Sequence, residues 1–209
     1  MCKRKSSMIL CCDHSMTSPN NQAFDDQVDK DLIASALAGN DQAFTTIMRR
    51  YKDNLFRFAL RHLDDSDDAE DAVQDAFVAA YNNLHRYKPQ YRLSTWLFQI
   101  TLNKCRDIGR KRKTRAFLQR LTPGIENTVA GSDALYNPET LSQSRTGVER
   151  LRAEIAHLPK GVKTAFILCV LEEKSHKDAG QILNLSPKAV ELRVYRARRH
   201  LKMIANSDL

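Results

Sequence analysis

The side chains best suited to recognition chemistry in this sequence are the cations near its C-terminal end. Residues 188–202 hold six lysines and arginines, and this segment also places apolar residues on one face of a predicted helix, at Val190, Val194, Ala197 and Leu201. Lysine and arginine bind DNA phosphates, and arginine also bonds to guanine. The chemistry that this segment could perform is therefore non-covalent binding of a nucleic acid.

Two helices and a turn would have to position these cations. A helix is predicted over 177–183, residues 184–186 interrupt it, and a longer helix follows. Ser186 can cap that second helix, and Pro187 suits its first position because proline lacks an N–H that would be unpaired there. Gly180 stands where the helices would cross, and its missing Cβ permits close approach. The pattern is typical of a helix-turn-helix, although a basic amphipathic helix on an ordinary helical domain would share most of it.

The exposed side of the second helix supplies candidate DNA contacts. They lie opposite the apolar stripe or follow it toward the C-terminus: Lys188, Glu191, Leu192, Tyr195, Arg196 and Arg199. The N-terminal part of a recognition helix reads bases, so Glu191, Leu192 and Arg196 are best placed to do so. Arg199 and its basic neighbours lie further along and are expected to contact phosphates, or simply to be solvated.

Composition narrows the class of protein. The chain has 209 residues, a formal net charge of +8 and a pI of about 9.3, which favour an anionic partner such as nucleic acid or a membrane surface. No apolar run is long enough to span a bilayer. Glycine and proline are few and helical spacing recurs, so we predict an all-α protein of two small domains. Cys105 and Cys169 fall inside helical patterns and are expected to be buried free thiols, as in a cytoplasmic protein.

A second candidate surface lies on a helix predicted over 68–85. Its core stripe consists of small and apolar residues at helical spacing: Ala69, Ala72, Val73, Ala76, Phe77, Ala80 and Leu84. Asp71, Gln74 and Asp75 share another face and continue the acidity past the first turn, in a basic protein. Acidic residues in a first turn interact favourably with the helix dipole and are usually just solvated. This acidic stripe is therefore either a binding surface or an ordinary solvated face.

A third candidate surface combines aromatic rings with positive charge. The loop over 86–92, RYKPQYR, precedes a helix predicted from Trp96 to about Lys113. One polar face of that helix carries residues at i, i+4, i+7 and i+8, namely Asn103, Asp107, Arg110 and Lys111. Rings beside cations suit unpaired bases, because stacking contributes about 1–3 kcal/mol per base. The alternative is a tyrosine-rich loop that packs on its own domain.

Changes in composition divide the chain. Residues 1–28 are predicted to form a disordered N-terminal extension, in which Cys11, Cys12 and His14 match the spacing of no common metal site. Helices over 28–37 and 42–63 complete a domain over 29–115. The second has Asp41 as its cap and apolar residues at helical spacing: Phe44, Ile47, Met48, Tyr51, Leu55, Phe58 and Ala59. Residues 116–147 are rich in Gly, Pro, Ser and Asn, which indicates a flexible linker. A second domain over 148–206 adds helices at 148–157 and 161–172 to the helix-turn-helix.

Four stretches of the chain together resemble the extracytoplasmic-function (ECF) group of the sigma-70 family of bacterial RNA polymerase sigma factors. They are AGNDQAFTTIMRRYKDNLFRFAL, DDAEDAVQDAFVAAYNNLHRY, STWLFQITLNKCRDIGRKRK and HLPKGVKTAFILCVLEEKSHKDAGQILNLSPKAVELRVYRARRHL, in this order. They cover about residues 29–113 and 148–202. Members of this group hold only the sigma-2 and sigma-4 domains, so the resemblance implies that fold.

The resemblance also implies partners and roles. A sigma factor binds core RNA polymerase and directs promoter-specific initiation; its first domain melts and reads the −10 element, and its second reads the −35 element. By similarity, Asp71, Gln74 and Asp75 would contact the β′ clamp helices, and the second domain would meet the β flap and read the −35 element through its recognition helix. The −10 contacts would be Trp96, Asn103, Asp107, Arg110 and Lys111. An anti-sigma factor holds many members inactive and is a further candidate partner.

The helix-turn-helix departs from the common pattern of the group. Residues 178–180 are Asp-Ala-Gly where Glu-Ile-Ala is common, and Ala189 and Glu191 stand where a threonine and a basic residue are common. The preferred −35 sequence therefore stays open.

Three other functions remain as alternatives. A stand-alone helix-turn-helix regulator with a sensor domain would need neither the acidic helix nor the second basic, aromatic-rich domain. A nuclease would need an acidic metal cluster near the basic patches, which the spacing does not offer. The sequence also shows no nucleophile–base–orienter set and no phosphate-binding glycine loop, so we predict neither an enzyme nor a cofactor. The third alternative is a scaffold that binds polymerase without directing initiation.

Overall fold

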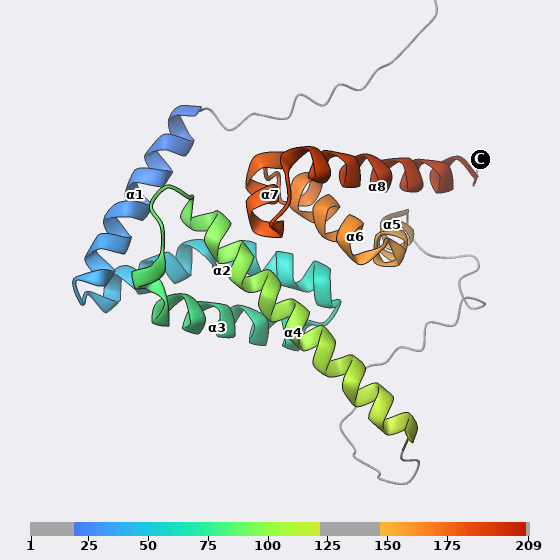
Figure 1. Ribbon diagram of the computed structural model, residues 1–209, viewed down its shortest axis with the longest axis horizontal. Helices are drawn as coiled ribbons and strands as arrows, with labels where there is room; N and C mark the ends of the chain where they lie inside the picture. The colour runs from blue at the N-terminus through green and yellow to red at the C-terminus, as the bar shows by residue number, and fades with distance from the viewer. Residues whose placement is uncertain (1–18, 122–146, 208–209) are drawn as a thin grey trace, which may run out of the picture.

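The computed structural model describes the backbone of residues 19–121 and 147–207, and all structural statements below concern these two ranges. Every regular element within them is helical, which confirms the prediction of an all-α protein. In chain order they are α1 (Pro19–Leu37), α2 (Asp41–Leu63), α3 (Ser66–Asn82), the 3₁₀ turn η1 (Leu84–Arg86), α4 (Leu93–Leu121), α5 (Gly147–His157), α6 (Lys160–Phe166), the π-helical turn η3 (Ile167–Leu171), α7 (His176–Leu183) and α8 (Pro187–Ser207). In Figure 1, α1 to α4 lie on one side and α5 to α8 on the other.

The helices α1 to α4 form the N-terminal half, in which α2, α3 and α4 contact one another and α1 packs on α2. Its core contains the predicted stripes of α2 and α3: Phe44, Ile47, Tyr51, Leu55, Phe58, Ala59, Ala69, Ala72, Val73, Ala76, Phe77 and Ala80. Four alanines in the α3 stripe let the neighbouring helices approach closely. Met48 was expected in the α2 stripe but is 38 % exposed, because it lies at the edge of the face that its neighbours fill.

Two helices are longer than the sequence predicts. The first helix begins at Pro19 rather than at Val28, inside the segment predicted to be disordered, and proline suits a first helical position. Residues 1–18, and with them the cysteines and histidine of the extension, lie outside the described ranges. The fourth helix continues past Lys113 to Leu121, into the predicted linker, because residues 114–121 contain strong helix formers.

One predicted cap was assigned to the wrong residue. The side chain of Asn40, not of Asp41, accepts a hydrogen bond at the start of α2, from the backbone N–H of Gln42 at 3.1 Å. Asn and Asp are both favoured cap residues, so residue type alone did not distinguish Asn40 from Asp41. The cap predicted for the recognition helix is confirmed, because the Ser186 hydroxyl accepts from the N–H of Ala189 at 3.2 Å at the start of α8.

The helices α5 to α8 form the C-terminal half. The helix predicted over 161–172 is divided into α6 and η3, so its last turn is wider than an α-helix. The two predicted helices of the helix-turn-helix are α7 and α8, and Asn184 ends α7 in the left-handed conformation at φ 55°. Cys105 is buried and Cys169 is half-buried, both as free thiols, and burial raises their pKa values to about 12 and about 11.

The two halves contact each other. α4 packs against α7, and α2 packs against η3. One continuous cluster of buried apolar residues contains members from both halves, including Phe58 and Phe98 from the first and Ile167 and Leu168 from the second. No sequence pattern indicated this contact, since the composition predicted two domains separated by a linker.

Candidate nucleic-acid interface

The helix-turn-helix presents one exposed face on α8. Val190, Val194 and Ala197 are buried, as predicted. The candidate DNA contacts are all exposed on the other side: Lys188, Glu191, Leu192, Tyr195, Arg196 and Arg199. The structure thus brings together on one helix face all six side chains selected from the sequence.

The turn between α7 and α8 depends on one glycine. A Cβ built on Gly180 would lie 2.7 Å from the backbone oxygen of Leu185, closer than real Cβ contacts come. The N–H of Leu185 also donates to the carbonyl oxygen of Gly180 at 2.8 Å. The predicted close approach is therefore real, but it is to the turn rather than to the second helix.

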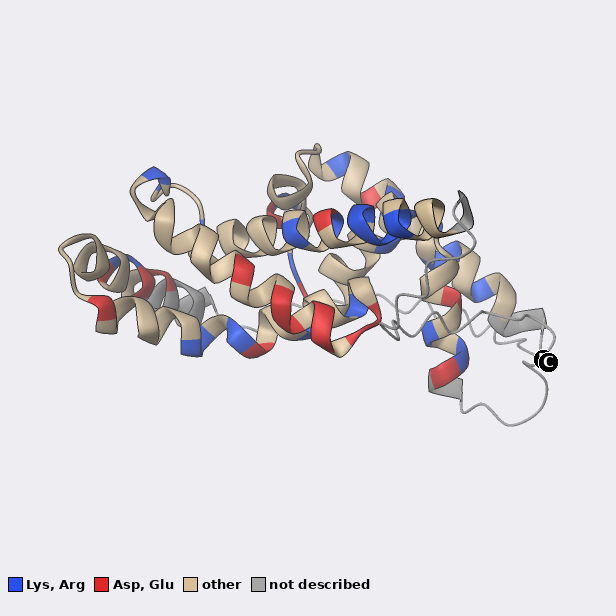
Figure 2. Cartoon of the chain, turned by 90° about the horizontal axis from the view of Figure 1, so that it is seen from below, with Lys and Arg blue, Asp and Glu red and all other residues tan. Residues whose placement is uncertain are grey.

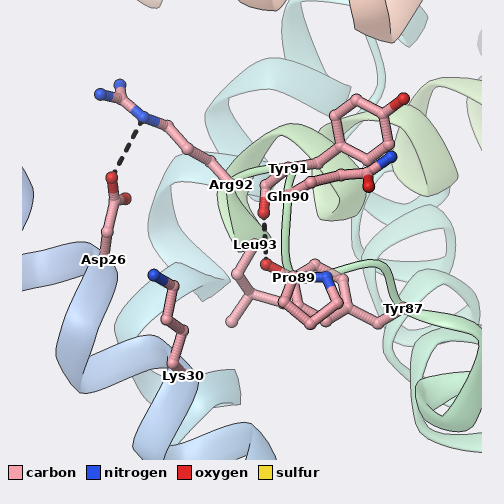
Figure 3. Close-up of a pocket in the computed structure, with 8 residues that line it drawn as sticks. All are labelled: Asp26, Lys30, Tyr87, Pro89, Gln90, Tyr91, Arg92 and Leu93. Carbon is pink, nitrogen blue, oxygen red and sulfur yellow. Dashed lines mark hydrogen bonds and ion pairs between the residues drawn. The ribbon is translucent and has the colours of Figure 1, made fainter.

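A pocket lies between α1 and the loop that precedes α4 (Figure 3). Its volume is about 210 Å³, and its lining is Asp26, Lys30, Tyr87, Pro89, Gln90, Tyr91, Arg92 and Leu93. The guanidinium of Arg92 pairs with the carboxylate of Asp26 at 3.3 Å, which links the loop to α1. The pKa of Tyr87 is raised to about 12, chiefly by burial and then by Asp29 and Asp26, so its hydroxyl stays protonated.

The aromatic rings of this loop are arranged in two ways. Tyr87 and Trp96 pack with their ring centroids 5.4 Å apart, and the Tyr87 hydroxyl donates to the backbone oxygen of Tyr91. The Tyr91 side chain is 41 % exposed and lies on the far side of the pocket from α1 (Figure 3). Trp96 is half-buried behind the loop rather than in the pocket lining. An exposed ring and a cation are therefore available to an unpaired base, while Trp96 supports the loop.

The polar face of α4 lies further along the helix that begins after this loop. Asn103, Arg110 and Lys111 are exposed, and Asp107 is half-buried and forms an ion pair with Arg110. The guanidinium of Arg106 donates to Asn103 Oδ1 at 3.5 Å. The four predicted residues therefore share one surface, in which Asp107 holds Arg110 in place.

The acidic face of α3 separates into structural and available carboxylates. Asp65 caps α3 by accepting from the N–H of Asp68 at 2.9 Å, and this hydrogen bond is the main reason why the pKa of Asp65 is lowered. The guanidinium of Arg112, from α4, lies 3.0 Å from Asp65 and also pairs with Asp68. Capping and pairing thus account for Asp65 and Asp68 at the start of the helix, whereas the dipole interpretation expected such acids to be solvated.

The remaining part of this face is exposed. Asp71, Gln74 and Asp75 all point to solvent, and Lys104 Nζ lies 3.6 Å from Asp75. Val78 continues the face and is 61 % exposed. Figure 2, seen from below, shows the acidic residues of α3 beside basic residues of α4. A mixed polar and apolar strip of this kind is suited to binding another protein.

Sequence reasoning missed two carboxylates near the pocket. Asp26 lies in the segment predicted to be disordered, and Asp178 comes from α7, with its carboxylate 3.8 Å from the Arg92 guanidinium. Asp178 is part of the cap of α7, where its N–H donates to the Ser175 hydroxyl and its carboxylate accepts from that hydroxyl, but the proximity of both carboxylates to Arg92 is seen only in the tertiary structure. In the described residues no group of three or more His, Cys, Asp or Glu side chains is arranged to hold a metal ion. None of the described helices combines the length and apolar character needed to cross a bilayer.

Two family models match the chain. The model of sigma-70 region 2 covers residues 47–115, and that of sigma-70 region 4 covers residues 148–201. The sigma factor CnrH of Cupriavidus metallidurans is 32 % identical over 191 residues, which are 88 % of this chain and 97 % of CnrH. The ECF sigma factor SigW of Bacillus subtilis is 30 % identical over 176 residues, which are 83 % of this chain and 94 % of SigW.

The fold agrees with a solved relative. The structure of CnrH in complex with the cytosolic domain of CnrY matches with a TM-score of 0.65 and 28 % identity, over 87 % of this chain and 99 % of that one. Both family models, the near full-length relatives and the helix-turn-helix geometry agree with one another. The chain therefore belongs to the ECF group of the sigma-70 family, and it is an RNA polymerase sigma factor that directs the initiation of transcription.

Proposed function

We propose that the three exposed surfaces divide the work of initiation between the two halves of the chain. Residues 29–115 act as the sigma-2 domain, which binds polymerase and melts the −10 element, and residues 148–206 act as the sigma-4 domain, which reads the −35 element. The observation that carries this proposal is that both surfaces suited to DNA and the one suited to protein lie on different helices, each exposed to solvent.

The −35 element binds along the exposed face of α8. Glu191 can accept from cytosine N4, Arg196 can bond to guanine, and Leu192 can pack on a thymine methyl group. Lys188, Tyr195 and Arg199 flank these three side chains on the same face. Arg199 lies furthest along the helix and contacts phosphate.

The −10 element binds as a single strand at the loop before α4. An extruded base enters the pocket of about 210 Å³ and stacks on the exposed ring of Tyr91. Unstacking costs a few kcal/mol per base, and stacking in the pocket offsets part of this cost. Asn103, Asp107, Arg110 and Lys111 hold the strand along α4, and Trp96 positions the loop.

Polymerase binds the acidic face of α3. Asp71, Gln74 and Asp75 meet the β′ clamp helices, and the sigma-4 domain meets the β flap. This assignment is supported by the division of the acids, since Asp65 and Asp68 have structural partners whereas Asp71 and Asp75 extend past them into solvent. The Asp75 carboxylate would exchange its contact with Lys104 for one with a cation of the polymerase.

The protein acts in the cytoplasm and performs no covalent chemistry of its own. A protein regulator such as an anti-sigma factor is a further partner, and the complex of CnrH with the cytosolic domain of CnrY is an example of a protein bound to a relative. Such a regulator would compete with polymerase for the exposed faces described above.

In vitro transcription with core polymerase on a promoter library tests this function. The chain should select promoters that share a −10 and a −35 element, and the Asn103→Ala variant should slow open-complex formation on duplex templates more than on pre-melted ones. Equal defects on both templates would assign Asn103 to folding or docking. Tight binding of promoter duplex without polymerase, and no stimulation of transcription, would favour the stand-alone regulator instead.

A further inference from the structure

An acid and two apolar side chains lie side by side on the exposed face of the recognition helix α8. Leu192 and Tyr195 are 49 % and 61 % exposed, and Glu191 is exposed as well. Tyr195 follows Glu191 by four positions and Leu192 by three on one continuous α-helix, so its ring neighbours both side chains. We call these three residues the 191–195 patch. A base edge that meets this patch meets a carboxylate and apolar surface together.

The carboxylate of Glu191 limits which bases the patch can accept. Lys188, Arg196 and Arg199 share its helix face and attract phosphates, whereas a carboxylate is repelled by them. Among the residues that the structure describes, none forms an ion pair with Glu191. Its charge becomes favourable beside DNA only where it accepts a hydrogen bond from a base. The donors in the major groove are the amino groups of cytosine and adenine, so Glu191 is restricted to these two bases.

The apolar side chains of the patch require a methyl group. Leu192 and Tyr195 would face polar base edges unless they pack on a methyl group, which thymine carries at C5 in the major groove. In an A·T pair, however, the thymine O4 acceptor lies between the adenine amino group and this methyl group, and it would repel Glu191. In 5-methylcytosine the amino donor and the methyl group are on adjacent ring carbons. This base therefore presents both features to the patch without an acceptor between them.

We propose that the 191–195 patch recognises 5-methylcytosine in the −35 element, where Glu191 accepts from the N4 amino group and Leu192 and Tyr195 cover the C5-methyl group. This inference rests on the proposed reading of the −35 element by α8. Unmodified cytosine offers only the first contact, and thymine offers only the second. Methylation of one cytosine strengthens the promoter, so initiation by this chain responds to DNA methylation.

The position of Tyr195 favours one base over two separate ones. Because this ring lies beside Glu191, it covers the base that the carboxylate contacts. A methyl group on a different base would leave the ring over the polar edge of the first. The proposal also concerns this chain rather than the whole group, since the basic residue that is common at position 191 could not accept from an amino group.

Selection of −35 sequences by the holoenzyme tests the proposal. The full chain with core polymerase is presented with two promoter libraries randomised over the −35 element, one synthesised with cytosine and the other with 5-methylcytosine. At one −35 position, 5-methylcytosine should be preferred over cytosine by about fourfold, which corresponds to burial of one methyl-sized group. Thymine at that position should bind more weakly than cytosine, because O4 replaces the amino donor.

Substitutions on α8 separate the two contacts. Leu192→Ala and Tyr195→Ala should each reduce the preference for 5-methylcytosine while cytosine remains selected, because they remove apolar surface only. Tyr195→Phe keeps the ring and should retain the preference. Glu191→Gln can donate as well as accept, so it should admit thymine at that position. Arg199→Ala is the matched control: it should weaken binding to both libraries alike and leave the ratio of 5-methylcytosine to cytosine unchanged.

Two results would overturn the proposal while the −35 element is still selected. The first is equal selection of cytosine and 5-methylcytosine at every −35 position. The second is weaker binding when deoxyuridine replaces a thymine next to a cytosine whose methylation has no effect, because the patch would then read two separate bases. In both cases the proposed function stands. A holoenzyme that selects no −35 sequence from either library would overturn the proposed function, and this inference with it.

Discussion

Individual carboxylates in this chain have different roles that depend on what surrounds them. Asp65 caps α3, while Asp75 is exposed beside Lys104. Asp29 is 4 % exposed and accepts a hydrogen bond from the Tyr51 hydroxyl. Burial, followed by this hydrogen bond, raises the pKa of Tyr51 well above its usual value, so the hydroxyl stays protonated and donates. Residue type alone does not separate a structural acid from one that is free to bind a partner.

Specificity for the −35 element should reside in single side chains of α8. We expect Glu191→Arg to change which −35 sequence is preferred, because it replaces an acceptor by a donor that favours guanine, with about 1–3 kcal/mol of discrimination per contact. Arg199→Ala should instead weaken all promoters alike and reduce the salt dependence, because about one fewer phosphate is neutralised. Selection from a randomised −35 library measures both effects. An identical preferred sequence for wild type and Glu191→Arg would show that Glu191 is only a solvated residue.

The stability of the chain should fall in acid because of His62. Burial, chiefly, lowers its pKa from 6.5 to about 4, and the nearby cations Lys163 and Arg106 act in the same direction. The unfolded chain therefore binds a proton to this ring more tightly than the folded chain does. The stabilisation is complete above about pH 6.5 and is lost as the pH falls to about 4, by at most about 3 kcal/mol at about 1.4 kcal/mol per pKa unit.

Denaturant unfolding at several pH values measures this loss. The His62→Gln variant should show a smaller change in unfolding free energy between pH 7 and pH 4 than the wild type. His85→Gln alters an exposed histidine and serves as the control. If the wild type and His62→Gln lose the same free energy over this range, another group is responsible.

Elements are specified in this chain largely by their ends. Side-chain caps start α2, α3, α7 and α8, and left-handed residues end α2 and α7 at Asp64 and Asn184. The sequence predicted the turn of the helix-turn-helix well because its signals are local. It predicted the start of α1 poorly, because α1 shows little amphipathic pattern. It also predicted the end of α4 poorly, because no cap or proline stops this helix near Lys113.

Gly180 lies where the turn before α8 comes closest to α7 in this chain, although alanine is common at this position in the group. We expect Gly180→Ala to destabilise the chain by about 1–3 kcal/mol, because its Cβ would meet the backbone oxygen of Leu185 at 2.7 Å. The matched control is Gly109→Ala on α4, where a Cβ meets nothing within 4 Å. There the better helix propensity of alanine should stabilise the chain by about 0.5–1 kcal/mol. Thermal unfolding of both variants decides the question, and equal effects would contradict the close approach.

The acidic face of α3 should bind polymerase as a unit. Asp75→Lys should weaken core binding by roughly tenfold, or about 1.4 kcal/mol, because it replaces an exposed acid with a cation at that face. Helicity should not change, since Asp75 lies outside the buried stripe. Asp53→Lys, on the exposed side of α2, is the control. Fluorescence anisotropy measures the affinity of each variant for core polymerase, and only Asp75→Lys should bind more weakly. Unchanged affinity for Asp75→Lys would show that this face does not bind polymerase.

At the scale of the whole molecule, the two halves should unfold together. Their buried apolar residues form one continuous cluster, and the Arg61–Glu172 ion pair lies between them. Calorimetry of the wild type should therefore show one cooperative transition, whereas Glu172→Arg should divide it into two. Two well-separated transitions in the wild type would show that the halves are energetically independent. Glu173→Arg should leave the single transition unchanged.

The sequence by itself determined the helical class, the buried stripes of α2 and α3, the turn before α8 and the six exposed residues of the recognition helix. These features depend on spacing and caps within one or two turns, which a linear reading contains. Only the tertiary structure decided that Asp26 and Asp178 meet at Arg92 and that Glu172 pairs with Arg61 across 111 positions. Contacts of this kind depend on how whole helices pack, because burial and shape complementarity between distant segments leave no periodic signal in the chain.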